Sequence, residues 1–212
     1  QDYIYRNSLY LREPQYKQII RAGFLRIEQA ECPDAALWEE LRAMAAAERR
    51  PLPEPDPRDS VLLLRRMDSG ARILGFLTLR TVSDRDLYGA FGDEDLADAV
   101  RCRAAGRVRL LTGLCLARIP GRSYDAGQLL LTEALSQAMG EDCGYAAWYG
   151  PAAGEELLDL LARQGFVPIA GTAERPLLLV DLRAPAVLLQ TIPTTLKEPF
   201  SSDPQVLTAI RK

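Results

Sequence analysis

The residues from 108 to 139 have the pattern of a strand, a short loop and a helix, which together can bind an anion. Residues 108–117 form a strongly apolar run, and the loop that follows contains Arg122, Ser123 and Gly127. The first N–H groups of a helix have no partner within the helix, and the helix dipole is positive at that end. A phosphate group suits such a site. On this segment alone an ordinary strand–helix connection is the simpler interpretation.

A second segment, over residues 154–166, combines a predicted helix with a Gly-Phe ending. Its last residues are Leu160-Leu-Ala-Arg-Gln-Gly-Phe166. Glycine often follows the last turn of a helix, because it adopts the left-handed backbone conformation without strain. The sequence therefore predicts that the helix ends near Arg163, with Gly165 as this left-handed residue.

In this order and spacing, the two segments resemble the GCN5-related N-acetyltransferase (GNAT) family. Arg122-Ser-Tyr-Asp-Ala-Gly127 is similar to the R-x-x-G-x-G/A loop of that family, and Leu160–Phe166 is similar to its L-Y-E-K-x-G-F helix end. Residues 25–30, followed by Pro33-Asp34, are similar to its opening strand and helix. The resemblance spans roughly residues 24–182 in element order, with partial matches to the motifs.

The resemblance implies an α/β fold, with a mixed central sheet, helices on both faces and splayed central strands. Acyl-CoA, as acetyl-CoA or another acyl donor, would bind as a substrate where the strands separate, and no metal is implied. Residues 108–117 would pair with the pantetheine arm, and the amides of residues 123–127 would hold the pyrophosphate. The positions implied to bind the donor are Leu116, Ala117, Arg118, Arg122, Ser123, Tyr124, Asp125, Ala126 and Gly127.

By the same resemblance, an acceptor amine attacks the thioester directly. A lysine-like amine with a pKa of ~10.4 is only ~10⁻³ deprotonated at neutral pH, so desolvation, a carboxylate or a water relay must offset about 4–5 kcal/mol. Many members carry a tyrosine on the late helix to protonate the leaving thiolate, and Leu161 stands there in this chain. Gly154 replaces an Asn that often occurs earlier on that helix. Tyr149 and Tyr124 are the candidate substitutes, with aromatic packing as the alternative role of both.

Asp125 stands where the family usually has the first Gly of its loop. A carboxylate ~5 Å from a phosphate would cost about 3 kcal/mol at an effective dielectric near 20, and less than ~1 kcal/mol in water. The spacing Asp125-Ala-Gly-Gln128 also matches a capping box, so Asp125 is expected to cap a helix that begins at Ala126. Its side chain would then occupy an amide that a phosphate would use.

The 212 residues include no histidine, which restricts the possible chemistry. Ser-His-Asp and Cys-His nucleophilic sites are excluded, and so are metal sites that use imidazole. Direct aminolysis of a thioester needs no protein nucleophile, so it is compatible with this composition. Cys115 is expected to be a small buried side chain rather than an acyl acceptor. The four cysteines are scattered, without a Cys-x-x-Cys pair: Cys32, Cys102, Cys115 and Cys143.

Hydrophobic periodicity predicts the element order β-α-β-β-insert-β-α-β-α-β-β, which is typical of a mixed sheet with helices on both faces. A short helix is also expected over residues 15–22. The acidic stretch 84–98 is either the lining of a pocket for a cationic amine or a solvated helix face in an insertion. The expected strands are 24–27, 61–65, 73–79, 108–117, 144–149, 166–169 and 176–182, and the expected helices are 35–49, 94–104, 126–139 and 154–163.

We expect three segments: an N-terminal extension (1–23), a GNAT-like acyltransferase domain (24–183) and a C-terminal arm or linker (184–212). The formal net charge of -3 gives no basic field, and no apolar run reaches the ~20 residues of a membrane span. Neither nucleic acid nor a membrane is therefore expected as a partner. The scattered cysteines and the lack of a signal-peptide pattern favour a cytoplasmic location.

Three functions remain open from the sequence. The first is an acyl-CoA-dependent N-acyltransferase that acts on an amine. The second is a GNAT-fold module that no longer catalyses and serves in binding, regulation or assembly, with the arm after Arg183 docking a protein partner or forming a homodimer. The third is an acyltransferase that uses acyl-carrier protein, for which an arginine-rich surface would recognise the acidic carrier.

Overall fold

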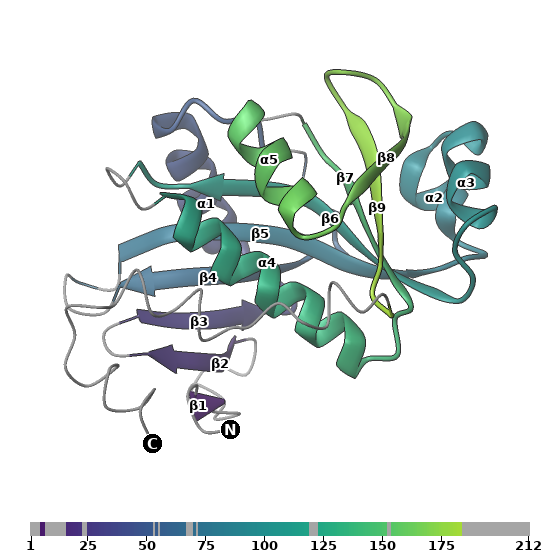
Figure 1. The fold of residues 1–212 in the computed structure, drawn as a ribbon. Helices are drawn as coiled ribbons and strands as arrows, with labels where there is room; N and C mark the ends of the chain where they lie inside the picture. The colour runs from purple at the N-terminus through teal and green to yellow at the C-terminus, as the bar shows by residue number, and fades with distance from the viewer. Residues whose placement is uncertain are drawn as a thin grey trace.

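Nine strands and five helices make up the described part of the chain (Figure 1). The computed structural model describes residues 5–6, 16–22, 25–52, 54, 56–66, 70, 72–118, 123–151 and 154–183, with only the backbone at 5–6, 16–22 and 123–125. The strands are β1 (Tyr5–Arg6), β2 (Tyr16–Ala22), β3 (Leu25–Ala30), β4 (Ser60–Arg66), β5 (Arg72–Ser83), β6 (Arg107–Leu116), β7 (Tyr145–Tyr149), β8 (Val167–Gly171) and β9 (Pro176–Asp181). The helices are α1 (Ala35–Ala47), α2 (Leu87–Phe91), α3 (Glu94–Arg101), α4 (Ser123–Gly140) and α5 (Glu155–Arg163).

The strands form one mixed sheet in the order β1-β2-β3-β4-β5-β6-β7-β9-β8. β6 and β7 run parallel, and the other neighbouring strands in the described sheet run antiparallel. The parallel pair needs a crossover, and α4 provides it. The predicted α/β fold with a mixed central sheet is confirmed.

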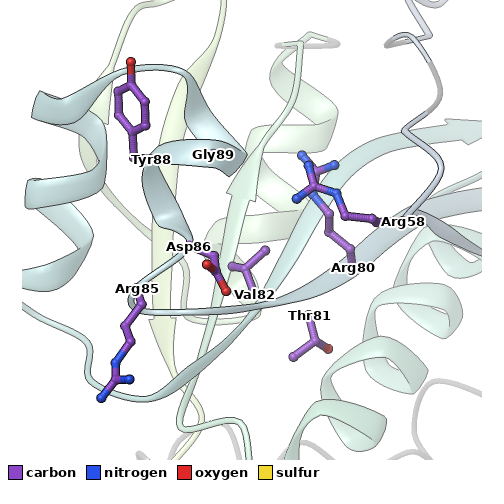
Figure 2. A pocket seen from close by; sticks show the side chains of 8 residues that line it. All are labelled: Arg58, Arg80, Thr81, Val82, Arg85, Asp86, Tyr88 and Gly89. Atoms are coloured by element: carbon purple, nitrogen blue, oxygen red, sulfur yellow. The ribbon is translucent and has the colours of Figure 1, made fainter.

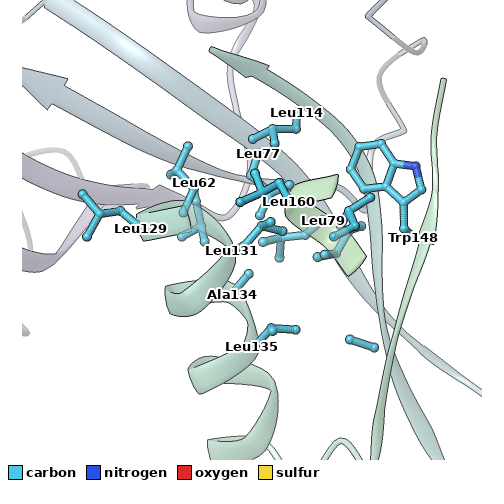
Figure 3. Close-up of a cluster of buried hydrophobic side chains, with 14 of the residues drawn as sticks. Leu62, Leu77, Leu79, Leu114, Leu129, Leu131, Ala134, Leu135, Trp148 and Leu160 are labelled. Carbon is cyan, nitrogen blue, oxygen red and sulfur yellow. The ribbon is translucent and has the colours of Figure 1, made fainter. Parts of the chain in front are cut away.

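Both faces of the sheet are covered, because side chains alternate along each strand. On β4, Leu62 and Leu64 join a core cluster with α4 and α5, whereas Val61 and Leu63 join a cluster with α1 on the opposite face. A third cluster packs α2 and α3 on that opposite face, over β6, β7 and β9. Figure 3 shows the α4–α5 cluster, where leucines from both helices meet leucines of the strands. The second face is thus divided between two separate apolar clusters.

The helix expected over residues 15–22 is wrong, because residues 16–22 form β2. It pairs antiparallel with β3, from Tyr16 opposite Ala30 to Ala22 opposite Leu25. Two β-branched residues, Ile19 and Ile20, lie in the middle of the segment and favour extended backbone. The edge of β3 supplies hydrogen-bonding partners for an extended segment, whereas a short isolated helix is only marginally stable in water. Part of the predicted N-terminal extension therefore belongs to the sheet.

The predicted start of the helix at Ala126 is also wrong. α4 begins at Ser123, so Asp125 is the third helical residue and not the cap that precedes the helix. A carboxylate in the first helical turn is still favoured by the helix dipole, which accounts for Asp125 without a capping role. Asp34, by contrast, caps α1 as its spacing suggests: its carboxylate accepts a hydrogen bond from Leu37 N at 2.8 Å.

Three helices end in the same way, with a left-handed residue after the cap. Gly165 has φ 91° after α5, which confirms its predicted place, and Phe166 N donates to Leu161 O at 3.1 Å. The corresponding residues after α1 and α4 are Arg49, with φ 52°, and Asp142, with φ 58°. A side chain in this conformation costs roughly 1–2 kcal/mol that glycine avoids. These two helix ends are therefore strained.

We predict that Arg49→Gly raises the free energy of unfolding by about 0.5–1 kcal/mol, because it relieves this strain, whereas Gly165→Ala lowers it by about 1–2 kcal/mol. Urea denaturation of the full chain measures both changes. As a control, Arg42→Gly, inside α1, should lower stability by about 1 kcal/mol. A loss of stability in Arg49→Gly as large as in this control would contradict the strain interpretation.

Candidate functional site

The sheet opens between β6 and β7. The two strands are paired from Val108, opposite Tyr145, to Leu111, opposite Trp148. Beyond Leu111, β6 continues to Leu116 along β5, whereas β7 follows β9. One edge of β6 therefore loses its neighbouring strand over its last residues, and Figure 1 shows the two strands diverging.

A β-bulge marks the start of this opening. Thr78 pairs with Gly113 and Leu79 pairs with Leu111, so Thr112 is an extra residue in β6. A bulge bends its strand and increases the local twist, which carries β6 away from β7. The two threonine hydroxyls lie 2.8 Å apart and both residues are buried. This hydrogen bond ties the bulge to β5.

Gly150 lies directly against the bulge. A Cβ atom at this position would sit 2.3 Å from the Thr112 carbonyl oxygen and 2.9 Å from the Thr112 carbonyl carbon. Both atoms belong to the backbone and cannot rotate away. Because Gly150 has no side chain, the backbone that follows β7 can lie against the backbone of β6 at Thr112, just before the two segments diverge.

The open edge of β6 carries backbone hydrogen-bonding groups. Ala117 N donates to Leu74 O at 2.8 Å, so Ala117 faces β5. Residues on an antiparallel strand alternate in direction, so Leu114 and Leu116 point their N–H and C=O groups away from β5, toward the opening. A ligand with an extended chain that contains amides could pair with these groups, as an added strand would.

Most of the residues that the sequence implied for donor binding lie around this opening. Leu116 and Ala117 end β6, and Arg118 follows with a side chain that is 84% exposed. Ala126 and Gly127 are buried in the first turns of α4. A Cβ on Gly127 would lie 2.7 Å from Leu160 and 2.9 Å from Leu116, so this glycine lets α4 approach β6 and α5 closely. Arg122 lies outside the described residues, as do the side chains of Ser123, Tyr124 and Asp125.

Tyr149, one of the two candidate acids, is the last residue of β7 and is buried. Its ring meets Phe91 of α2 edge to face at 5.1 Å, and the guanidinium of Arg175 lies 4.1 Å above the ring. These contacts support its packing role, and its action as an acid stays a prediction. Leu161, at the position where the family often has tyrosine, is fully buried between α4, α5 and the sheet.

The acidic residues of the insertion contact neighbouring groups of the protein itself. Asp93 caps α3 by accepting from Leu96 N at 3.2 Å, and Asp84 accepts from Gly106 N at 3.1 Å. Glu94 and Asp98 both contact Arg101, at 2.6 and 2.8 Å. The stretch thus has the character of a solvated surface rather than of a pocket for a cation.

Two groups near the end of β6 were missed by the sequence reasoning. Arg50, after α1, approaches Gly154 at the start of α5, where a Cβ would be 3.8 Å from its Nη1. Glu48 lies 3.9 Å from Arg118 Nε. No motif marks these residues, because α1 and β6 are distant in the sequence and the sheet brings them together.

Burial raises the pKa of the Cys115 thiol to about 11, with the negative charge of Glu48 as a second cause. The side chain lies on the α1 face of β6, within an apolar cluster. Burial also raises the pKa of Cys143. A thiol that remains protonated is a poor nucleophile, so Cys115 is unsuited to accept an acyl group.

We predict that iodoacetamide at pH 8 labels the exposed Cys32 and Cys102 and spares Cys115, since a thiol with a pKa of about 11 is only ~10⁻³ ionised at that pH and is buried besides. Peptide mass spectrometry over time measures the rates. Labelling of Cys115 as fast as that of Cys32 would contradict this description.

The raised pKa also means that the contribution of Cys115 to stability is fully present below about pH 9 and is lost as the pH rises toward 11.

The fold is similar to that of solved acetyltransferase structures. NAA60 from Arabidopsis thaliana in complex with acetyl-CoA is 13% identical and superposes with a TM-score of 0.51, over 72% of this chain and 96% of that one. The same enzyme with a bisubstrate analogue gives 14% identity and a TM-score of 0.50, over 72% and 95%. This chain has the GNAT fold. An agmatine N-acetyltransferase variant in its apo form is 10% identical, with a TM-score of 0.51 over 75% and 100%.

At these identities the similarity shows the GNAT fold alone. No protein-family model and no curated protein sequence matches the chain. Within the described part of the chain, no helix is both long and apolar enough to cross a membrane. β1 and β2 come before residue 24 in the chain and extend the sheet beyond the predicted GNAT-like domain, which contains the seven strands β3 to β9.

We predict that Gly150→Ala lowers the free energy of unfolding by about 2–3 kcal/mol, because its Cβ would collide with the backbone of Thr112 where the GNAT sheet opens. Urea denaturation measures the loss. Gly140→Ala is the matched control: a Cβ there meets nothing within 4 Å, so stability should stay the same or rise. Equal stability of the Gly150→Ala and parent proteins would show that the close approach is not required.

Proposed function

We propose that this chain is an acyl-CoA-dependent N-acyltransferase, with acetyl-CoA as the first candidate donor. The observation that carries the proposal is the opening between β6 and β7, with the N-terminus of α4 after the longer strand. That pairing of an exposed strand edge with a helix N-terminus provides hydrogen-bonding groups for an extended amide chain and for an anion. Acyl-CoA contains both in one molecule.

The donor would lie along β6 and over the start of α4. The backbone of Leu114 and Leu116 would pair with the pantetheine amides, and the amides of residues 123–127 would bind the pyrophosphate. Arg118 and Arg122 would add positive charge, together with Ser123 to Gly127 as the binding segment. The side chains of Leu116 and Leu160, packed against Gly127, would form the apolar floor.

The reaction would be direct aminolysis. The nitrogen of the neutral amine attacks the thioester carbonyl carbon, the carbon–sulfur bond breaks, and the amide forms as CoA leaves as a thiolate. The amine loses one proton and the thiolate gains one. With no histidine in the chain, a water relay beside the Thr112 hydroxyl fits the first transfer, and Tyr149 or Tyr124 is the proposed donor for the second.

A second candidate function is a GNAT-fold module that binds or regulates without catalysing. The complete burial of Leu161 and the packing of Tyr149 on two sides favour it, since both positions then lack an available acid. In that case the sheet, which begins with β1 and β2, would form the folded unit together with its helices, and residues 184–212 would be an arm that contacts a protein partner or a second copy of the chain. The arm lies outside the described residues.

Calorimetry of the full chain with acetyl-CoA, CoA and a long-chain acyl-CoA tests the proposal. We expect binding of at least one donor, followed by acylation of an amine in a thiol-release assay. Binding without turnover over a broad amine panel would favour the regulatory module. No binding of any of the three at about 1 mM would contradict the acyl-CoA-dependent acyltransferase.

We predict that Asp125→Asn tightens CoA binding by about tenfold, because it removes a carboxylate from the first turn of α4, where the phosphates would sit. Asn keeps the size of the side chain. The matched control is Asp95→Asn, which changes an acidic residue in the first turn of α3. If Asp125→Asn leaves the affinity unchanged, the pyrophosphate does not bind at this turn.

A further inference from the structure

A cavity of about 320 Å³ lies between the end of β5 and α2, on the face of the sheet opposite α4 and α5. It belongs to neither the open edge of β6 nor the first turn of α4. Figure 2 shows its lining. The eight lining residues are Arg58, Arg80, Thr81, Val82, Arg85, Asp86, Tyr88 and Gly89.

Two guanidinium groups share one carboxylate beside this cavity. Arg58 binds Asp56 through Nε at 2.9 Å and Nη2 at 2.7 Å, and Arg80 Nη1 lies 2.5 Å from the same carboxylate. In Figure 2 the heads of Arg58 and Arg80 lie close to each other, whereas Arg85 extends away. Asp56 therefore holds two cations together at the cavity wall, and these arginines hold its pKa below the usual range.

Arg80 is largely buried, and its hydrogen-bonding groups are not all satisfied. Its side chain is 10% exposed, and among the described residues no hydrogen-bond acceptor meets its Nε. Asp59, 4% exposed, lies 3.4 Å from Nη1, and Ala90 O accepts from Nη2 at 3.4 Å, which is a long contact. A buried donor without an acceptor is costly, so the polar groups of Arg80 are only partly compensated by the protein.

The charges around the cavity favour an anion over a cation. Three arginines and one carboxylate line it, and the carboxylate of Asp86 already accepts from Ser83 Oγ at 2.7 Å. Behind the lining, Asp56 is occupied by its two arginines. Burial raises the pKa of Asp59, whose carboxyl lies 3.4 Å from Arg80 Nη1 and offsets part of the charge of Arg80. The positive charge of an amine would be repelled by the arginines, whereas a carboxylate or phosphate can accept two parallel hydrogen bonds from a planar guanidinium group.

The cavity lies a short distance from the opening of the sheet. Arg80 is two residues along β5 from Thr78, which is about 7 Å, and Thr78 bonds to Thr112 at the bulge. These polar residues separate the apolar cluster under α1 from the one under α2 and α3. A small molecule with an anionic group at Arg80 could therefore place a nitrogen near the bulge.

We propose that this cavity binds the anionic group of the acceptor, so that the acceptor is an amine that also carries a carboxylate or a phosphate. The proposal rests on the acyltransferase function proposed above, which it narrows to a substrate class. Arg58 and Arg80 are its specificity residues. The amine itself lies outside the cavity, toward Thr112.

Direct binding to the full chain tests the cavity without any acyl donor. Calorimetry compares 6-aminohexanoate and O-phosphoethanolamine with hexylamine and ethanolamine, which lack the anion. We expect at least one anionic probe to bind at least tenfold more tightly than its neutral-ended partner, and the better of the two identifies carboxylate or phosphate. Equal affinities within both pairs, or no binding of either anionic probe at about 10 mM, would overturn the proposal.

Arg58→Gln is the diagnostic variant, since the side chain of Arg58 is 59% exposed and its replacement should leave the fold intact. We expect this substitution to weaken binding of the anionic probe at least fivefold. Arg42→Gln, which removes an exposed arginine paired with Glu39 on α1, should leave binding unchanged. Equal effects of the two variants would mean that only the overall charge matters, and would contradict the site.

Acylation rates separate this proposal from the one on which it rests. One outcome is that acetyl-CoA binds, hexylamine is acetylated as fast as 6-aminohexanoate, and ethanolamine is acetylated as fast as O-phosphoethanolamine. In that case the cavity does not bind the anionic group of the acceptor, but the proposed acyltransferase function stands. If an anionic probe binds through Arg58 but the chain neither binds acetyl-CoA nor acylates any amine, the acyltransferase is wrong and the chain keeps an anion site.

Discussion

The close contact between Gly150 and the backbone of Thr112 is the constraint on which the other features depend. β6 and β7 are paired up to Leu111 and Trp148, and they separate immediately afterwards, where Gly150 lets the two backbones approach closely. The bulge at Thr112 turns β6, and the hydroxyl pair with Thr78 fixes the turn within the sheet. A regular sheet would pair the last residues of β6 with a neighbour and leave no edge for a ligand.

The two faces of the sheet then serve different purposes. On one face, α4 and α5 share a continuous core, and Gly127 lets α4 pack closely enough to place its N-terminus at the opening. On the other face, the apolar clusters are separate, and a polar row of Asp59, Arg80 and Thr78 lies between them. The opening at Thr112 connects the proposed donor side with the proposed acceptor side.

Features that depend on neighbouring residues could be predicted from the sequence, whereas contacts between distant segments could not. Asp34 and Gly165 act within one helical turn, so their roles follow from neighbouring residues. The strand β2 was missed because its partner, the edge of β3, decides its conformation. The bulge at Thr112 depends on the register between β5 and β6, and the contact of both Arg58 and Arg80 with Asp56 joins residues that are distant in the sequence. Those interactions form the candidate site, so the order of elements was predictable and the site geometry was not.

Amide hydrogen exchange tests most directly whether the open edge of β6 binds the acyl donor. Exchange at single residues, measured by NMR with and without saturating acetyl-CoA, reports whether the donor pairs with this edge. We predict slower exchange at Leu114 or Leu116 and no change at Cys115, whose N–H faces β5 by the alternation of the strand. Unchanged exchange at both Leu114 and Leu116 with acetyl-CoA bound would contradict the account.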